Sequence, residues 1–174
     1  MSIKTIFLDR DGVINKDTQY LYKIDDFIFI DGIFDACHHF QKLGYKIIVV
    51  TNQSGIHRRL YAESDYKKLT KWMVAKFKKN LIDILDVFYC PHGPNSNCGC
   101  RKPKPGMLIE AQVKHNIDMV NSWMIGDKNR DIEAALSAGI KNTILLSDSK
   151  SLQLGSNAQF VINSLEETKN LIRS

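Results

Sequence analysis

Two aspartates separated by a single residue, Asp9 and Asp11, follow a short apolar run near the start of the sequence. A carboxylate that is buried without a partner costs free energy, and carboxylate oxygens are preferred ligands of hard divalent cations such as Mg²⁺. Aspartate and glycine are also common where a strand enters a turn, and the pair taken alone fits such a turn better. Its chemistry therefore depends on the other polar groups that the fold brings to it.

Two further stretches offer groups that suit an anion. The polar residues 51–54 follow an apolar run and precede a glycine, and they fit an anion-binding loop and a plain polar loop about equally. In residues 101–106, two prolines keep the residues before them extended. A lysine there is either a fixed positive charge for a phosphate or part of an exposed basic loop. Composition does not show whether Lys102 or Lys104 points inward.

Apolar runs bounded by turn residues alternate with helical patterns along the chain. Strands are expected at residues 3–8, 46–50, 86–89, 122–125, 143–146 and 160–162, and helices at 33–43, 62–81, 105–115 and 130–138. Ser164 and Glu167 form a capping-box pattern that predicts a last helix. The alternation predicts an α/β fold with a mostly parallel sheet and helices on both faces. In such sheets ligands bind beyond the carboxyl ends of the strands, where Asp9, Thr51 and Asp127 are expected to lie.

Four residues, Cys90, His92, Cys98 and Cys100, supply three thiolates and one imidazole within eleven positions. They form a closed ligand set for a tetrahedral, structural Zn²⁺, which would fix a loop that cannot bury enough apolar surface to order itself. The spacing is not that of a zinc finger, and buried free cysteines or a redox pair are the alternatives. Cys37 lies in an apolar helical pattern and is expected in the core.

The chain has 174 residues, of which 44% are apolar and 25% charged, a composition typical of a single globular domain. No apolar run reaches the roughly 18 residues of a membrane span, and the first apolar stretch is too short for a signal peptide. We therefore expect a cytoplasmic protein without a membrane partner. The net charge of +5 suits a phosphorylated metabolite or a nucleic acid. Six lysines within residues 67–79 fit a solvated helix face better than a nucleic-acid surface.

In this order, and each at a strand end, the stretches around Asp9, Thr51, Lys102 and Asp127 resemble the four motifs of the haloacid dehalogenase (HAD) superfamily of phosphohydrolases. The resemblance covers residues 5 to about 140. It implies a single domain over residues 1–174, built as a three-layer α/β sandwich around a Rossmann-like, mostly parallel sheet. The gaps between the first three motifs are too short for a cap domain, so the site is expected to be open. A zinc-binding loop is implied at about residues 90–100.

The finer match is to the D-glycero-D-manno-heptose 1,7-bisphosphate 7-phosphatases, in residues 8–15, 51–56, 89–92, 98–103 and 126–128. It implies removal of the 7-phosphate in the biosynthesis of nucleotide-activated heptose, for lipopolysaccharide or surface glycans. The related histidinol-phosphate phosphatases are the main alternative, and a non-catalytic, zinc-stabilised nucleic-acid-binding domain is a remote one. The motifs do not distinguish the two anomers of the substrate, which lead to ADP-heptose or GDP-heptose. A monomer is the expected state.

The superfamily resemblance also implies a mechanism. Asp9 is the nucleophile that forms an aspartyl-phosphate, and Asp11 acts first as general acid and then as general base. Thr51 and Lys102 hold the phosphoryl oxygens while their charge changes.

The same resemblance implies the metal and substrate ligands. Mg²⁺ lies between the Asp9 carboxylate, the Asp11 backbone carbonyl and Asp127, while Asp131 supports them or caps a helix. The residues implied to line the sugar and its distal phosphate are Asp17, Thr18, Gln19, Tyr20, Asn52, Gln53, Ser54, Arg58, Arg101 and Lys128. After Arg58 the relatives often have glycine where this chain has Arg59, which leaves the path of that loop open.

Overall fold

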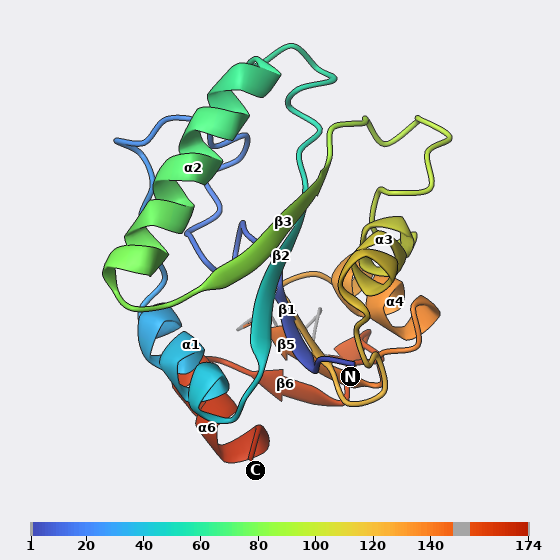
Figure 1. The fold of residues 1–174 in the computed structure, drawn as a ribbon. Helices are drawn as coiled ribbons and strands as arrows, with labels where there is room; N and C mark the ends of the chain where they lie inside the picture. Colours follow the sequence, from blue (N-terminus) through green and yellow to red (C-terminus); the bar gives the residue numbers. More distant parts are fainter. Residues whose placement is uncertain (1, 148–153, 174) are drawn as a thin grey trace.

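β-Branched and apolar runs form a fully parallel sheet, whose six strands in the described chain follow the order β3-β2-β1-β4-β5-β6 (Figure 1). The computed structural model describes residues 2–147 and 154–173. Its strands are β1 (Thr5–Leu8), β2 (Lys46–Asn52), β3 (Ile84–Cys90), β4 (Trp123–Gly126), β5 (Asn142–Leu146) and β6 (Phe160–Ile162). Leu8 of β1 aligns with Val49 of β2 and with Ile125 of β4. The segments that follow these three strands therefore leave the sheet at the same edge.

Helices cover both faces of the sheet (Figure 1). One face carries α1 (Ile33–Lys42), α2 (Glu63–Lys79), the 3-10 helix η1 (Leu165–Glu167) and α6 (Thr168–Leu171), and the other carries α3 (Gly106–His115) and α4 (Asn129–Ser137). Alternate residues of β1 enter different cores, because successive side chains of a strand point to opposite faces. Leu8 shares a core with Phe40 of α1, and Phe7 shares the other with Leu108 of α3. The predicted three-layer α/β sandwich is confirmed.

The predicted strands and helices are present, with small differences at their ends. The first strand begins at Thr5, because Ile3 forms an isolated bridge with Ile117 instead. The last helix is divided into η1 and α6. The predicted capping box is confirmed, since the Glu167 carboxylate accepts the backbone N–H of Ser164 at 3.0 Å.

Side-chain burial on the first two helices follows the sequence patterns. Cys37 of α1 is fully buried in the core, and burial raises the pKa of its thiol. The lysines of α2 are exposed or half-buried on its outer face, while Leu69, Met73 and Phe77 point into the core. None of the helices in residues 2–147 and 154–173 is long and apolar enough to cross a membrane.

Candidate active site

A buried lysine joins two aspartates at the carboxyl edge of the sheet. Lys102 is only 2% exposed, and its Nζ lies 3.0 Å from Asp9 Oδ1 and 2.8 Å from Asp131 Oδ1. Its backbone is fixed too, because its N–H and C=O both bond the side chain of Asn52 at 3.0 Å. Lys104 lies on the surface and donates to a backbone carbonyl of the neighbouring loop. Of the two lysines, Lys102 therefore points into the acidic cluster, and Lys104 does not.

The carboxylate of Asp11 is held in a polar network. Arg10, which is 1% exposed, donates to it from Nε at 3.1 Å and from Nη2 at 2.9 Å. Asn15 and Gln53 donate to the same carboxylate at 3.0 and 3.2 Å, and Gln53 also donates to the buried Thr51 hydroxyl at 2.8 Å. The network therefore links the ends of β1 and β2. Sequence reasoning missed Arg10, because an arginine between two aspartates gives no signal that its side chain turns inward.

Three carboxylates, those of Asp9, Asp127 and Asp131, offer oxygens that all lie within 4.8 Å of one another. Burial, followed by the charge of Asp131, raises the pKa of the Asp9 carboxyl well above its ordinary value, and Lys102 opposes this only in part. The same two causes raise the pKa of Asp127, whose buried Oδ1 has no hydrogen-bond partner. An acidic cluster with an unsatisfied buried oxygen fits a divalent cation such as Mg²⁺.

Asp131 connects helix α4 to this cluster. Its Oδ2 accepts the backbone N–H groups of Asp127 and Lys128 at 3.2 and 3.1 Å, which caps the first turn of α4. Its Oδ1 pairs with Lys102. A Cβ on Gly126 would lie 2.3 Å from the Asp131 Cβ, so only glycine permits this close approach of β4 to the helix. Both oxygens of Asp131 have partners within the chain, whereas Asp127 has an oxygen without one.

An open cavity of about 390 Å³ lies beside Asp11. It is lined by residues that follow several strands: Asp11, Asp17, Gln19, Tyr20, Asn52, Gln53, Ser54, Arg58, Tyr61, Pro94, Arg101, Lys128 and Arg130. The residues implied to bind the substrate are all among them except Thr18, which lines a neighbouring pocket formed by the loop 18–28. Tyr61 and Pro94 were not predicted, because they lie outside the motif stretches, and Arg130 lies within the fourth stretch at a position to which the motif assigns no role.

The loop after β2 forms one wall of the cavity. The Tyr61 hydroxyl donates to Gln53 Oε1 at 2.6 Å, and a Cβ on Gly55 would lie 2.1 Å from the Tyr61 ring. Arg58 lies over the Tyr20 ring, with its guanidinium carbon 5.9 Å from the ring centroid. Arg59 has a φ of 57°, in the left-handed region that favours glycine. Arg59, where the family resemblance implies a glycine, thus adopts a backbone conformation that suits glycine.

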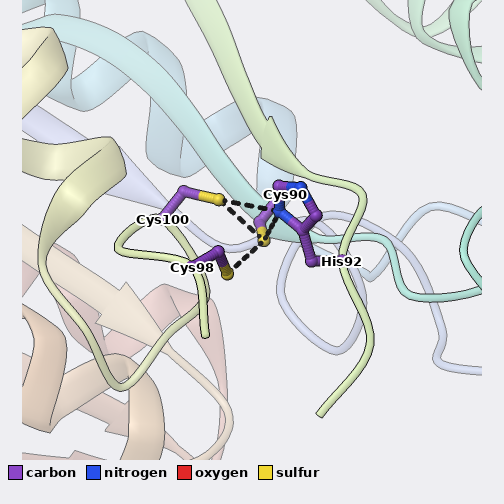
Figure 2. Close-up of side chains that lie close together, drawn as sticks. All are labelled: Cys90, His92, Cys98 and Cys100. Carbon is purple, nitrogen blue, oxygen red and sulfur yellow. Dashed lines mark hydrogen bonds between the residues drawn. The ribbon is translucent and has the colours of Figure 1, made fainter. Parts of the chain in front are cut away.

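The cysteine and histidine side chains of the 90–100 loop converge on one point (Figure 2). Cys90 Sγ lies 2.9 Å from Cys100 Sγ and 3.7 Å from Cys98 Sγ, and His92 Nδ1 lies 3.3 Å from Cys100 Sγ. Cys90 ends β3 and is buried, whereas most residues of the loop beyond it are exposed or half-buried. The loop therefore buries little apolar surface of its own. Four ligands from one short loop are compatible with a closed, tetrahedral zinc site.

The loop of residues 90–100, here called the Cys/His loop, also contacts the cavity wall. Arg101, directly after Cys100, donates from Nη1 to the backbone carbonyl of His92 at 3.2 Å. A Cβ on Gly93 would lie 2.7 Å from the ring of His57, which belongs to the loop after β2. The Cys/His loop therefore supports two walls of the cavity, through Arg101 and through His57.

Comparison with known proteins agrees with the family resemblance found in the sequence. Residues 99–168 match the model of the HAD-hydrolase-like family. The D-glycero-beta-D-manno-heptose-1,7-bisphosphate 7-phosphatase of Yersinia pestis is 41% identical, over 99% of this chain and 97% of its own. The D-glycero-alpha-D-manno-heptose-1,7-bisphosphate 7-phosphatase of Campylobacter jejuni is 48% identical, over 86% of each chain.

A solved structure agrees with these relatives. The crystal structure of D,D-heptose 1,7-bisphosphate phosphatase from B. bronchiseptica, complexed with magnesium and phosphate, superposes with a TM-score of 0.87. The two sequences are 28% identical, and the match covers 97% of each chain. By its sequence, its parallel sheet and the buried acidic cluster at the edge of that sheet, this chain belongs to the D-glycero-D-manno-heptose-1,7-bisphosphate 7-phosphatase family of the HAD superfamily.

Proposed function

We propose that this chain hydrolyses the 7-phosphate of D-glycero-D-manno-heptose 1,7-bisphosphate, in the biosynthesis of nucleotide-activated heptose. One observation carries the proposal: the buried pair of Asp9 and Lys102 lies at the edge of a sheet where a cavity lined by further cations opens at Asp11. A carboxylate beside a fixed positive charge is equipped to attack one phosphate. The cationic cavity suits a second phosphate of the same substrate.

In the proposed reaction Asp9 attacks the phosphorus while the bond to the sugar oxygen breaks and Asp11 gives that oxygen a proton. Water then hydrolyses the aspartyl-phosphate, and Asp11 takes a proton from the water, so both carboxyls return to their starting states. Lys102 and Thr51 stabilise the charge on the phosphoryl oxygens. Gln53 donates hydrogen bonds to both Asp11 and Thr51. It thereby fixes the position of the Asp11 carboxyl group relative to the threonine that binds the phosphoryl group.

The proposal includes Mg²⁺ in the acidic cluster. Asp9 and Asp127 would hold the ion through carboxylate oxygens, and Asp11 would hold it through its backbone carbonyl. When bound, Mg²⁺ offsets the repulsion between a carboxylate nucleophile and a phosphate dianion. Three observations support the ion: the raised pKa of Asp9, the unpartnered oxygen of Asp127, and the magnesium and phosphate in the B. bronchiseptica relative.

Gly12 permits the loop after β1 to pass close to Asp127. Its φ is +86°, and a Cβ at this position would lie 2.2 Å from Asp127 Oδ2. We expect Gly12→Ala to displace the Asp127 carboxylate and to lower kcat by roughly 100-fold, the cost of about 1 Å of misplacement in an active site. The measurement is phosphate release during a Mg²⁺ titration, in which the half-saturating Mg²⁺ concentration should also rise.

Gly139→Ala is the matched control for this prediction. Gly139 has a φ of +87°, but a Cβ there would meet nothing within 4 Å, and it lies outside the cavity. The control should lose some thermal stability through backbone strain and keep its kcat. Equal losses of kcat in both variants would show that backbone strain, and not contact with Asp127, causes the effect.

The proposal also includes a structural Zn²⁺ bound by Cys90, His92, Cys98 and Cys100. All four positions are filled by the chain, so such an ion has no open position for the reaction and would act by ordering the loop. Support comes from the convergence of the four side chains and from the small apolar surface that the loop buries.

We expect Cys98→Ser to release the zinc, which elemental analysis of the purified protein measures against one equivalent in the parent. Because the ion replaces a missing apolar core in the loop, its loss should make residues 91–100 the first site of proteolytic cleavage. Cys37→Ala is the control: it destabilises the core but leaves the zinc content at one equivalent. A parent protein without zinc, or a Cys98→Ser variant that retains it tightly, would contradict the assignment.

Phosphate release with Mg²⁺ from both anomers of the heptose bisphosphate and from histidinol phosphate tests the proposed substrate. We expect a kcat/KM for one heptose anomer roughly 100-fold or more above that for histidinol phosphate. A preference for histidinol phosphate would replace the substrate but keep the mechanism. No release from any of the three would overturn the proposal.

The proposal also includes that the protein is a cytoplasmic monomer that does not bind nucleic acid. Cell fractionation tests the location, gel filtration tests the oligomeric state, and gel-shift assays test the binding of nucleic acid.

A further inference from the structure

Four positive side chains from separate segments of the chain line the cavity: Arg58, Arg101, Lys128 and Arg130. We call them the cationic rim. Lys128 is paired with Asp127 at 2.8 Å. Among the described residues, no carboxylate oxygen lies within 4.0 Å of a guanidinium nitrogen of the three arginines in the rim. Asp17 also lines the cavity, but the three arginines have no ion-pair partner among the described residues there, and like charges gathered in this way favour the binding of an anion between them.

Arg101 and Arg130 come from separate segments of the chain and line the same cavity. Arg101 is held in place by its hydrogen bond to the His92 carbonyl at 3.2 Å. The guanidinium group of Arg101 directly follows the Cys/His loop, and that of Arg130 belongs to the first turn of α4. A planar guanidinium can bind a phosphate through two parallel hydrogen bonds, and two of them suit a dianion.

The position of Arg130 separates it from the phosphate that is cleaved. It follows Asp127 by three residues in the first turn of α4, and the next residue, Asp131, points inward to Lys102. Arg130 itself is exposed and lines the cavity. In this turn, Asp131 therefore contacts the buried Lys102, whereas Arg130 lines the open cavity. An anion at Arg130 lies outside the buried phosphoryl site.

We propose that Arg130 is a specificity-determining residue, which binds, together with Arg101, the phosphate that the enzyme does not hydrolyse. The inference rests on the proposed function and adds a residue to it. A substrate with two phosphates reaches both the buried site and the cationic rim, whereas the 7-monophosphate reaches only the buried site. Arg130 therefore contributes to the preference for the bisphosphate and not to the chemical step.

The test is the ratio of kcat/KM for heptose 1,7-bisphosphate to that for heptose 7-phosphate. In Arg130→Gln we expect kcat/KM for the bisphosphate to fall about tenfold, the effect of losing a charge-assisted hydrogen bond at a partly exposed site. The value for the 7-phosphate should stay within about twofold. Arg173→Gln removes the same charge from the exposed C-terminal region, away from the cavity, and should leave the ratio unchanged. Arg130→Lys keeps the charge but loses the planar guanidinium, so its ratio of the two kcat/KM values should lie between those of the parent and Arg130→Gln.

Inhibition by the products gives an independent readout. In Arg130→Gln the inhibition constant of heptose 1-phosphate should rise about tenfold, while that of inorganic phosphate stays the same. If both substrates lose activity in parallel, or if neither the ratio nor the inhibition constant changes, the role of Arg130 is wrong. A parent enzyme that releases phosphate from neither heptose overturns the proposed function itself, so the two failures are distinct.

Discussion

The variant Asp9→Asn is expected to release no phosphate above background, a loss of roughly 10⁴-fold or more in kcat. An amide oxygen is a poor nucleophile for phosphorus, and no other described carboxylate lies where Asp9 does beside Lys102 except Asp131, which is occupied in capping α4. The measurement is phosphate release from the heptose bisphosphate with saturating Mg²⁺. Residual turnover within tenfold of the parent would show that Asp9 is not the nucleophile.

Thermal unfolding of the same variant separates lost chemistry from lost folding. The raised pKa of Asp9 means that burial and the neighbouring carboxylates disfavour its charged form in the folded protein. At neutral pH the ionised carboxylate therefore lowers stability, and a neutral amide of the same size relieves that cost. In the absence of Mg²⁺ we expect the Tm of Asp9→Asn to equal or exceed that of the parent. Asp31→Asn, at an exposed position, is the control that should change neither quantity.

The second large effect is expected for Lys102→Met, which removes the positive charge between two buried carboxylates. Lys102 stabilises both Asp9 and Asp131, and although burial opposes it, Asp131 and Asp9 raise the pKa of the lysine, so it stays charged. Removing one partner of a buried ion pair leaves an uncompensated charge and costs about 3–5 kcal/mol. We expect a free energy of unfolding lower by that amount in denaturant titrations without Mg²⁺, together with loss of nearly all activity.

The double variant Lys102→Met/Asp131→Asn tests the cause of this effect. Removing one of the stranded carboxylates should recover part of the stability, because an asparagine side-chain oxygen can still accept the N–H groups that cap α4. Activity should not recover, since the positive charge for the phosphoryl group is still missing. If the double variant is as unstable as Lys102→Met, or if the single variant is as stable as the parent, the buried ion cluster is not what stabilises this edge of the sheet.

The elements that carry the motifs could be predicted because their physical signals are local. The β-branched run of β2 and the apolar run of β1 read directly as buried strands, and the parallel α/β alternation places their ends at one edge. That edge brings Asp9, Lys102 and Asp131 into contact, although they are up to 122 positions apart. Topology, and not proximity in sequence, makes the placement of Asp9 and Asp127 at this edge predictable, whereas the choice of Lys102 over Lys104 came from the family resemblance.

The parts that could not be predicted depend on where individual side chains turn. The alternation of Asp and Arg does not show that Arg10 is buried against Asp11, and the position of Arg130 in α4 does not show that it lines the cavity. Both depend on the packing of loops from different strands. Thr18 is the opposite case: it was predicted to line the substrate cavity together with its neighbours in sequence, but it lines another pocket.

The most direct test of the central claim is ³¹P NMR of a reaction mixture of the parent enzyme, Mg²⁺ and D-glycero-D-manno-heptose 1,7-bisphosphate. The account predicts that the signal of the 7-phosphate disappears, that inorganic phosphate appears in equal amount, and that the 1-phosphate remains on the sugar. It also predicts that the Asp9→Asn protein leaves both sugar phosphates intact. Loss of the 1-phosphate, or no change in either signal with the parent enzyme, would contradict the account.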